Sequence, residues 1–111
     1  IKNKSISFSD NKETAYRLAM LIAKKFSKLH GFKYNKISIK NHKSKWGSCS
    51  KKGNLNFNYR IVFLPKRLAE YIVVHELCHL VELSHSQRYW RLVENALPNY
   101  KELIEELKKY Y

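Results

Sequence analysis

The first third of the chain carries hydrophobic residues at helical spacing. Over residues 12–30 they recur every three or four positions, which places them on one face of an α-helix. Ser9, Asp10 and Asn11 precede this stretch and offer N-cap side chains, and Gly31 follows it and is typical of a helix end. The pattern therefore predicts an amphipathic helix over residues 12–30. Its apolar positions are Ala15, Leu18, Ala19, Ile22, Ala23 and Phe26.

The middle of the chain alternates between apolar and polar residues, a pattern typical of β-strands. Residues 36–42 and 46–49 form two such stretches, and in a third the residues Leu55, Phe57 and Tyr59 alternate with asparagines. Between the second and third stretches, residues 51–54 carry a glycine and predict a turn. We expect a small antiparallel sheet of about three strands.

The last part of the chain is predicted to be helical. Pro65 suits the first turn of a helix, and residues 68–81 are apolar on nearly every side, so this helix should be buried and central. Ser84 and Gln87 have the spacing of a capping box. That box would begin a further helix, which ends before Pro98. A final amphipathic helix is expected over residues 100–111, with its apolar stripe at Leu103, Ile104 and Leu107.

These elements indicate an α+β fold in a single domain spanning residues 1–111. A chain of 111 residues is long enough for one hydrophobic core. No stretch approaches the roughly 18 consecutive apolar residues of a membrane span, and the lysine-rich start lacks the apolar core of a signal peptide. We therefore expect a cytoplasmic protein without membrane insertion.

Charge is unevenly distributed along the sequence. The net charge is +13, but residues 1–67 carry 17 Lys and Arg against two acidic residues, whereas residues 68–111 carry five basic and seven acidic residues. A basic half of this kind favours acidic partners such as nucleic acid, nucleotides or acidic peptides. A solvated lysine-rich surface explains the same composition, so nucleic acid is an open alternative rather than a conclusion.

The candidate chemistry lies in the central apolar helix, where His75, Glu76 and His79 form an HExxH pattern. Residues four apart share one helix face, so the two imidazoles can bind one metal ion. The glutamate beside the first histidine is placed to take a proton from a metal-bound water. Without such a ligand these three polar groups would be buried without partners, which is costly. The pattern predicts a zinc-dependent hydrolase.

A catalytic zinc takes three protein ligands and leaves one position for water. His85 is the first choice for the third ligand, because the capping box places it in the first turn of the next helix, facing the metal. Glu94 is the alternative, since many zincins use a glutamate from the following helix. Glu82 replaces the glycine of the metzincin pattern and no methionine follows the motif, so the metzincin version is excluded.

Stabilising the oxyanion of the reaction usually needs a further electrophile. Tyr89, Tyr59 and Asn58 are the candidates, and the sequence does not choose among them. Cys78 directly precedes His79 and therefore lies on another face of the helix. It is expected to pack in the core. Cys49 is interpreted as a small buried residue beside the site, with a role as metal ligand as the alternative.

Residues 44–50 read Ser-Lys-Trp-Gly-Ser-Cys-Ser and are followed by Gly53, Leu55 and Asn58. Together with residues 71–80 and 85–100, this segment resembles the signatures of YgjP-type and SprT-type metallopeptidase domains. The short length resembles the minimal zincins called minigluzincins. One departure is Lys45, where these families usually have arginine, and this change weakens a bidentate contact without touching the metal motif.

The resemblance implies a zincin-like fold, in which a backing helix and a small antiparallel sheet precede the active-site helix and two C-terminal helices. It also implies His75, His79 and His85 as zinc ligands and Glu76 as the general base. Members of this group are held latent by C-terminal segments, so residues 99–111 are a candidate latency segment. That segment could instead exchange with a second copy, giving a homodimer rather than a monomer.

The leading hypothesis is a zinc peptidase acting on a peptide or protein substrate. The substrate would add as a strand along the sheet's rim, at Leu55, Asn56 and Phe57. Two alternatives stay open: a metal-dependent hydrolase of nucleotides or phosphoanhydrides, and a nucleic-acid-associated module with a structural zinc. A glycine-rich phosphate loop is absent, which counts against the first, and a fourth ligand such as Cys49 would distinguish the second.

Overall fold

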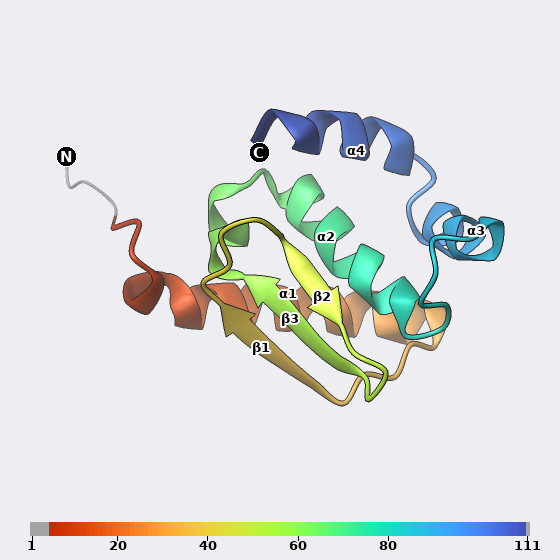
Figure 1. The fold of residues 1–111 in the computed structure, drawn as a ribbon, viewed down its shortest axis with the longest axis horizontal. Coiled ribbons are helices and arrows are strands. Elements are labelled where there is room, and N and C mark those ends of the chain that lie inside the picture. The colour runs from red at the N-terminus through yellow and green to blue at the C-terminus, as the bar shows by residue number, and fades with distance from the viewer. Residues whose placement is uncertain (1–4, 111) are drawn as a thin grey trace.

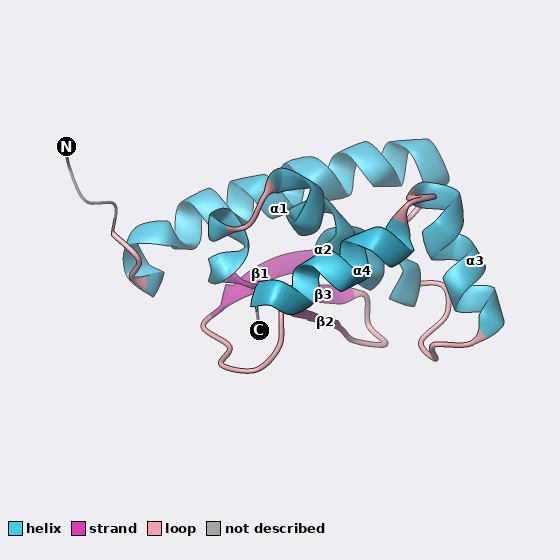
Figure 2. Ribbon diagram, turned by 90° about the horizontal axis from the view of Figure 1, so that it is seen from above, coloured by secondary structure: helices cyan, strands magenta, loops and turns pink. Residues whose placement is uncertain are grey.

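The computed structural model describes residues 5–110, and residues 1–4 and 111 lie outside this description. Helix α1 lies behind a three-stranded sheet, and helix α2 runs diagonally beside the sheet (Figure 1). Helices α3 and α4 complete the chain, and α4 lies alongside α2 (Figures 1 and 2). The predicted α+β class is confirmed, with an N-terminal helix, a small sheet, a central helix and two C-terminal helices.

Helix α1 spans Phe8–His30 and begins four residues earlier than predicted. Its N-cap is Ser7, whose hydroxyl accepts a hydrogen bond from the Asp10 backbone N–H, so the predicted capping residues 9–11 lie inside the helix. The extra turn is stabilised by Phe8, whose ring packs edge-on against Tyr59 at 5.4 Å between centroids. Gly31 ends the helix in the left-handed conformation, as predicted.

The sheet consists of β1 (Lys36–Lys40), β2 (Gly47–Cys49) and β3 (Asn54–Asn58) in the order β1-β3-β2. The prediction of a purely antiparallel sheet is wrong in one pair, because β1 and β3 run parallel and only β2 and β3 are antiparallel. The chain reverses direction twice between β1 and β3. Since β3 then inserts between the first two strands, it meets β1 in the same direction.

Strand β3 ends one residue before Tyr59, which the alternation had placed in the strand. Tyr59–Phe63 forms a short 3₁₀-helix, η1, with Asn58 as its N-cap. The Asn58 side chain accepts from the Arg60 N–H and donates to the carbonyls of His42 and Lys45. One buried amide therefore ends β3 and fixes the loop that leads to β2.

Helix α2 spans Lys66–His79, directly after Pro65, and is buried on nearly every side as predicted. Helix α3 covers Gln87–Ala96 and α4 covers Tyr100–Leu107, followed by the 3₁₀-helix η2 at Lys108–Tyr110. Within residues 5–110, no helix combines the length and the apolar composition that a membrane crossing requires. Leu103 and Leu107 of α4 are buried, so the predicted apolar stripe of this helix packs against the core.

Candidate metal centre

His75 and His79 lie one turn apart near the C-terminal end of α2, where the helix is packed between α3 and the sheet. His79 is buried, and its Nδ1 is 3.0 Å from the carbonyl oxygen of Glu82. A carbonyl only accepts, so Nδ1 carries the proton and Nε2 presents a lone pair. The turn after α2 therefore sets the tautomer that a metal ligand needs.

His85 approaches from the loop between α2 and α3. The prediction that it lies in the first turn of α3 is wrong, because Ser86 is the N-cap and its hydroxyl accepts from the Tyr89 N–H. Ser84 instead donates to the Glu82 carboxylate, so the capping box does not form. A loop position frees His85 from helical geometry and lets its ring turn back toward α2.

The Nε2 atoms of the three histidines converge on one point. His85 Nε2 is 3.1 Å from His79 Nε2 and 3.4 Å from His75 Nε2. Two nitrogens that each lie about 2.1 Å from a tetrahedral zinc are about 3.4 Å apart, so this spacing fits a zinc ion. Among the described residues, the cluster of potential ligands holds these three histidines and no cysteine or carboxylate. For a four-coordinate ion, this donor set would leave one position that no described residue fills.

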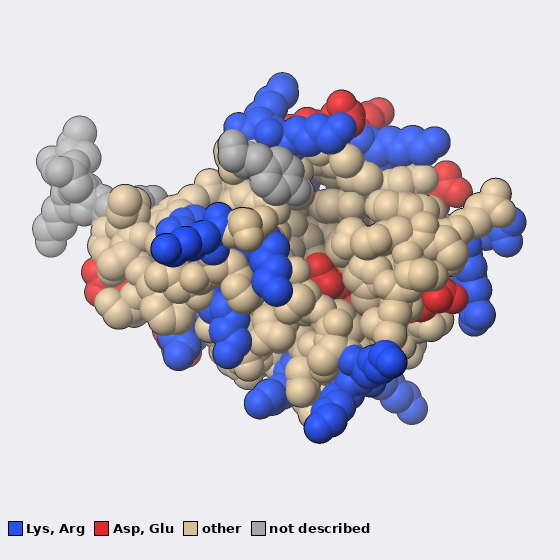
Figure 3. Space-filling model, viewed as in Figure 1, with Lys and Arg blue, Asp and Glu red and all other residues tan. Residues whose placement is uncertain are grey.

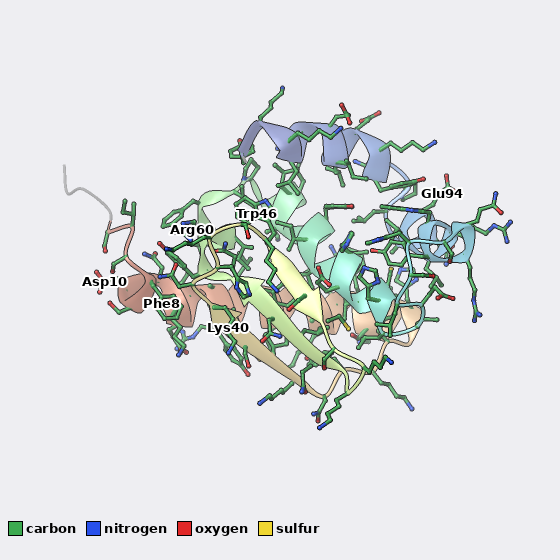
Figure 4. The ribbon with its side chains drawn as sticks, viewed as in Figure 1. Phe8, Asp10, Lys40, Trp46, Arg60 and Glu94 are labelled. Atoms are coloured by element: carbon green, nitrogen blue, oxygen red, sulfur yellow. The ribbon has the colours of Figure 1, made fainter. Side chains whose placement is uncertain are left out.

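Two of the three histidines, His75 and His79, are held in the neutral form that metal binding requires. Burial lowers the pKa of His75 to about 3, with further lowering from the neighbouring His79 and His85. Burial also lowers the pKa of His79. Glu94, the alternative third ligand, is exposed on α3 and lies outside the cluster (Figure 4).

Aromatic side chains support the cluster from behind. The Tyr71 hydroxyl is 3.2 Å from His75 Nδ1, and the Tyr89 ring stacks on His79 with 4.4 Å between centroids. Trp90 stacks on His85 at 5.8 Å. The sequence interpretation missed the contact of Tyr71 with His75, although its position four residues before His75 on the same helix is a signal for it.

Glu76 faces a cleft beside the cluster. It is 6% exposed, and burial raises its pKa to about 7, with Lys45 acting in the opposite direction. Gly47 of β2 permits this position, because a Cβ atom there would lie 3.2 Å from Glu76 Cγ and 3.0 Å from the Asn56 carbonyl oxygen. Gly47 is thus a residue of the site, although the sequence indicates it only as part of the family signature at residues 44–50.

The cleft has a volume of about 290 Å³ and lies between α2, the start of β2 and the C-terminal helices. His75 and Glu76 line its α2 wall, and Trp46 lies on the opposite side (Figure 4). Ile104, Leu107 and Lys108 close it from α4 and η2.

The side-chain donors of the three oxyanion candidates are already hydrogen-bonded to backbone carbonyls. The Tyr89 hydroxyl donates to the His75 carbonyl at 2.8 Å, and the Tyr59 hydroxyl donates to the Ile6 carbonyl at 2.9 Å. Asn58 holds the loop before β2, as described above. Of the three, Tyr89 alone touches the histidine cluster, through its ring.

The predicted rim strand is wrong. Leu55, Asn56 and Phe57 belong to β3, which is the central strand and has neighbours on both edges. Leu55 and Phe57 are fully buried, so a substrate strand cannot pair there. The rim beside the cleft is β2. The alternation of polar and apolar residues indicates that one face of the strand is solvated. It does not indicate whether the strand lies at the edge of the sheet, which explains the error.

Both cysteines pack without a disulfide. Cys78 is fully buried, as predicted, and Cys49 is half-buried with its thiol directed at the Ser50 carbonyl. Burial raises the pKa of Cys49 to about 11, and the nearby Glu76 adds to this. Among the described residues, the thiol of Cys49 lies outside the cluster of potential ligands formed by the three histidines.

Comparisons with known proteins agree with this arrangement. The sequence profile of the family described as YgjP-like, metallopeptidase domain, matches residues 6–110. Among solved structures, the metallopeptidase zymogen abylysin of Pyrococcus abyssi superposes with a TM-score of 0.73 at 24% sequence identity, over 82% of this chain and 93% of that chain. This similarity shows a shared fold. No curated protein matches the chain.

Proposed function

The chain belongs to the YgjP-like metallopeptidase family, and from this membership we propose that it is a zinc peptidase whose metal ligands are His75, His79 and His85. The observation that carries the proposal is the convergence of three Nε2 atoms beside a buried glutamate that lines a cleft. Such a donor set holds zinc and leaves a position for water, as a hydrolytic site requires.

When bound, zinc would supply a Lewis acid that acidifies water and polarises the scissile carbonyl. Glu76 is proposed as the general base. Its carboxyl is buried beside the histidine cluster and lines the cleft, where it is placed to accept a proton from water and pass it to the leaving amine. Its buried position on α2 keeps the carboxyl directed into the cleft rather than into solvent.

The substrate is proposed to pair with β2 rather than β3. Trp46 and Ser50 form backbone hydrogen bonds with β3, at Asn58 and Asn54 respectively. Alternation in an antiparallel ladder then directs the N–H and C=O groups of Gly47 and Cys49 to the free edge, beside Glu76. An extended peptide can add there as a fourth strand.

The C-terminal segment, residues 99–111, is proposed to restrict access to this cleft. Ile104 and Leu107 line it, and Glu106 of α4 pairs with Arg67 of α2, Arg67 Nε lying 2.8 Å from Glu106 Oε1. The similar abylysin structure is that of a zymogen, which supports a latent form here. Removal of residues 99–111, or Glu106→Lys in the full chain, should increase peptide turnover. A dimer by exchange of α4 would appear as a doubled mass in solution.

The proposal is tested by reconstituting metal-free protein with zinc and measuring cleavage of an unfolded protein and of nucleoside triphosphates. We expect one zinc per chain and proteolysis in the wild type or in the truncated chain. Glu76→Gln should retain zinc and lose roughly 10²- to 10⁴-fold in rate. Cleavage of triphosphates alone would overturn the peptidase proposal, and unchanged turnover by Glu76→Gln would overturn the role of Glu76.

A further inference from the structure

A second, smaller pocket adjoins the histidine cluster at the far end of β2. It has a volume of about 260 Å³ and includes His79, so it opens beside the proposed zinc site. Leu80 and Leu83, from the turn after α2, form its apolar wall. A peptide paired with the free edge of β2 would run from Gly47 past Cys49 and reach this pocket at the β2–β3 turn. The pocket is therefore on the path proposed for the substrate.

Three lysines from two separate segments surround this pocket. Lys51 and Lys52 come from the β2–β3 turn, and Lys33 comes from the connection between α1 and β1. Asn35 fixes the two segments together, because its N–H donates to the Gly53 carbonyl at 2.7 Å and its side-chain amide donates to Asn54 Oδ1 at 2.7 Å. The lysines are thus brought together by the fold and not by their sequence spacing.

These lysines have no acidic counterpart in the pocket. No carboxylate lines it, and within residues 5–110 no ion pair involves any of the three. The nearest acidic residue in sequence to the apolar wall, Glu82, is engaged by Ser84 and lies 4.0 Å from Arg88. Figure 3 shows basic side chains projecting over this end of the sheet. Like charges held together without a counter-ion favour binding of an anionic group.

We propose that this pocket, formed by Lys33, Lys51 and Lys52 beside His79, binds acidic side chains of the peptide substrate and makes the enzyme selective for acidic segments. The inference rests on the proposed peptidase function and adds a substrate class to it. No Phe, Tyr or Trp lines the pocket, and its one aromatic ring, the His79 imidazole, is already stacked on Tyr89, so no free ring is offered to a nucleic-acid base. That absence favours a carboxylate-bearing peptide over a nucleic acid.

Binding is measured separately from cleavage, so that failure of this proposal can be distinguished from failure of the peptidase proposal. The zinc-loaded Glu76→Gln protein is titrated into a fluorescent extended peptide carrying three Glu residues, and into the same peptide with Gln in their place. We expect about tenfold tighter binding of the acidic peptide, since each exposed charge pair contributes only modestly. The difference should shrink at high salt.

Charge-neutralising variants locate the effect. Lys51→Gln with Lys52→Gln should remove most of the preference, and Lys33→Gln should remove part of it. The matched control is Lys24→Gln with Lys28→Gln, which removes two exposed lysines from α1, outside the pocket. An equal loss in this control, equal affinity for the two peptides, or tighter binding of a single-stranded oligonucleotide of the same charge would each overturn the proposal. If the acidic preference persists while the wild type cleaves no peptide, only the peptidase proposal fails.

Discussion

The two halves of helix α2 bury different chemistry. In the first half, residues 66–72, Leu68 and Ala69 are fully buried and Ile72 is nearly so, all among apolar neighbours. In the second half, His75, Glu76 and His79 are withdrawn from water at a cost that apolar contacts do not offset. One half is stable through packing alone, whereas the other needs hydrogen-bond partners and a ligand. A helix of fourteen residues thus combines a structural core with the proposed metal centre.

The largest expected effect separates these halves by metal affinity. His79→Ala removes one of three ligands, so zinc affinity should fall on the order of 10³-fold or more, and turnover with it. Leu68→Ala, in the first half of the helix and fully buried, should leave zinc affinity within a few-fold. Zinc titration with a competing chelator measures both. Equal losses in the two variants would show that the cluster is not the binding site.

The same two variants should rank in the reverse order when their free energies of unfolding are compared. Leu68→Ala leaves a cavity in the core and should lower the free energy of unfolding by about 2–5 kcal/mol. His79→Ala should destabilise the metal-free protein much less, because it also removes a buried polar group. Urea denaturation without metal provides the measurement. Destabilisation by His79→Ala that matches that of Leu68→Ala would mean that both halves of α2 are stabilised by packing alone.

The pH dependence of the metal-free protein sharpens the comparison further. Glu76 has a pKa raised from 4.5 to about 7, so the folded state binds more protons than the unfolded state in this window, and stability falls as pH rises through it. Glu76→Gln removes this loss and should be more stable than the wild type above pH 7, by about 3 kcal/mol. The two proteins should converge below pH 4.5.

His75 acts in the opposite direction. Its pKa is lowered from 6.5 to about 3, so the unfolded state takes up protons first, and stability falls as pH decreases from 6.5 toward 3. In Glu76→Gln this effect is no longer opposed between pH 4.5 and 6.5, and stability should rise steeply with pH. A flat profile in that variant would contradict the assignment of His75 as a buried neutral group.

The smallest effect concerns Tyr71, whose hydroxyl contacts His75 Nδ1. Tyr71→Phe should weaken zinc binding by about 10- to 100-fold, as loss of a hydrogen bond behind a ligand typically does. The matched control is Tyr59→Phe, because that hydroxyl donates to the Ile6 carbonyl, away from the cluster. Chelator competition should show unchanged zinc affinity in the control. Unchanged affinity in both variants would show that Tyr71 does not support zinc binding.

The parts of this fold that could be predicted are those set by local patterns. Helical periodicity identified α1 and α2, and the HExxH spacing fixed His75 and His79 on one face because four residues make about one turn. The approach of His85 could be expected from its proximity in sequence. Its position in a loop could not, because the choice between Ser84 and Ser86 as N-cap depends on what each hydroxyl contacts.

Features that depend on strand order could not be predicted from the sequence. The alternation of Leu55 and Phe57 identified a strand, but the central place of β3 follows from its insertion between β1 and β2. The close approach of Gly47 to Glu76, and the gathering of Lys33 with Lys51, both depend on that topology. Local propensity carries no information on either contact.

We infer that His75 and His79 from the polar half of α2, together with His85 from the following loop, form a zinc centre with one coordination position left for water. X-ray absorption at the zinc edge of the reconstituted protein tests this claim most directly. We expect three imidazole nitrogens and one oxygen that no protein residue supplies. A sulfur ligand at about 2.3 Å, which would place Cys49 on the metal, or a fourth imidazole or carboxylate from the chain would contradict it.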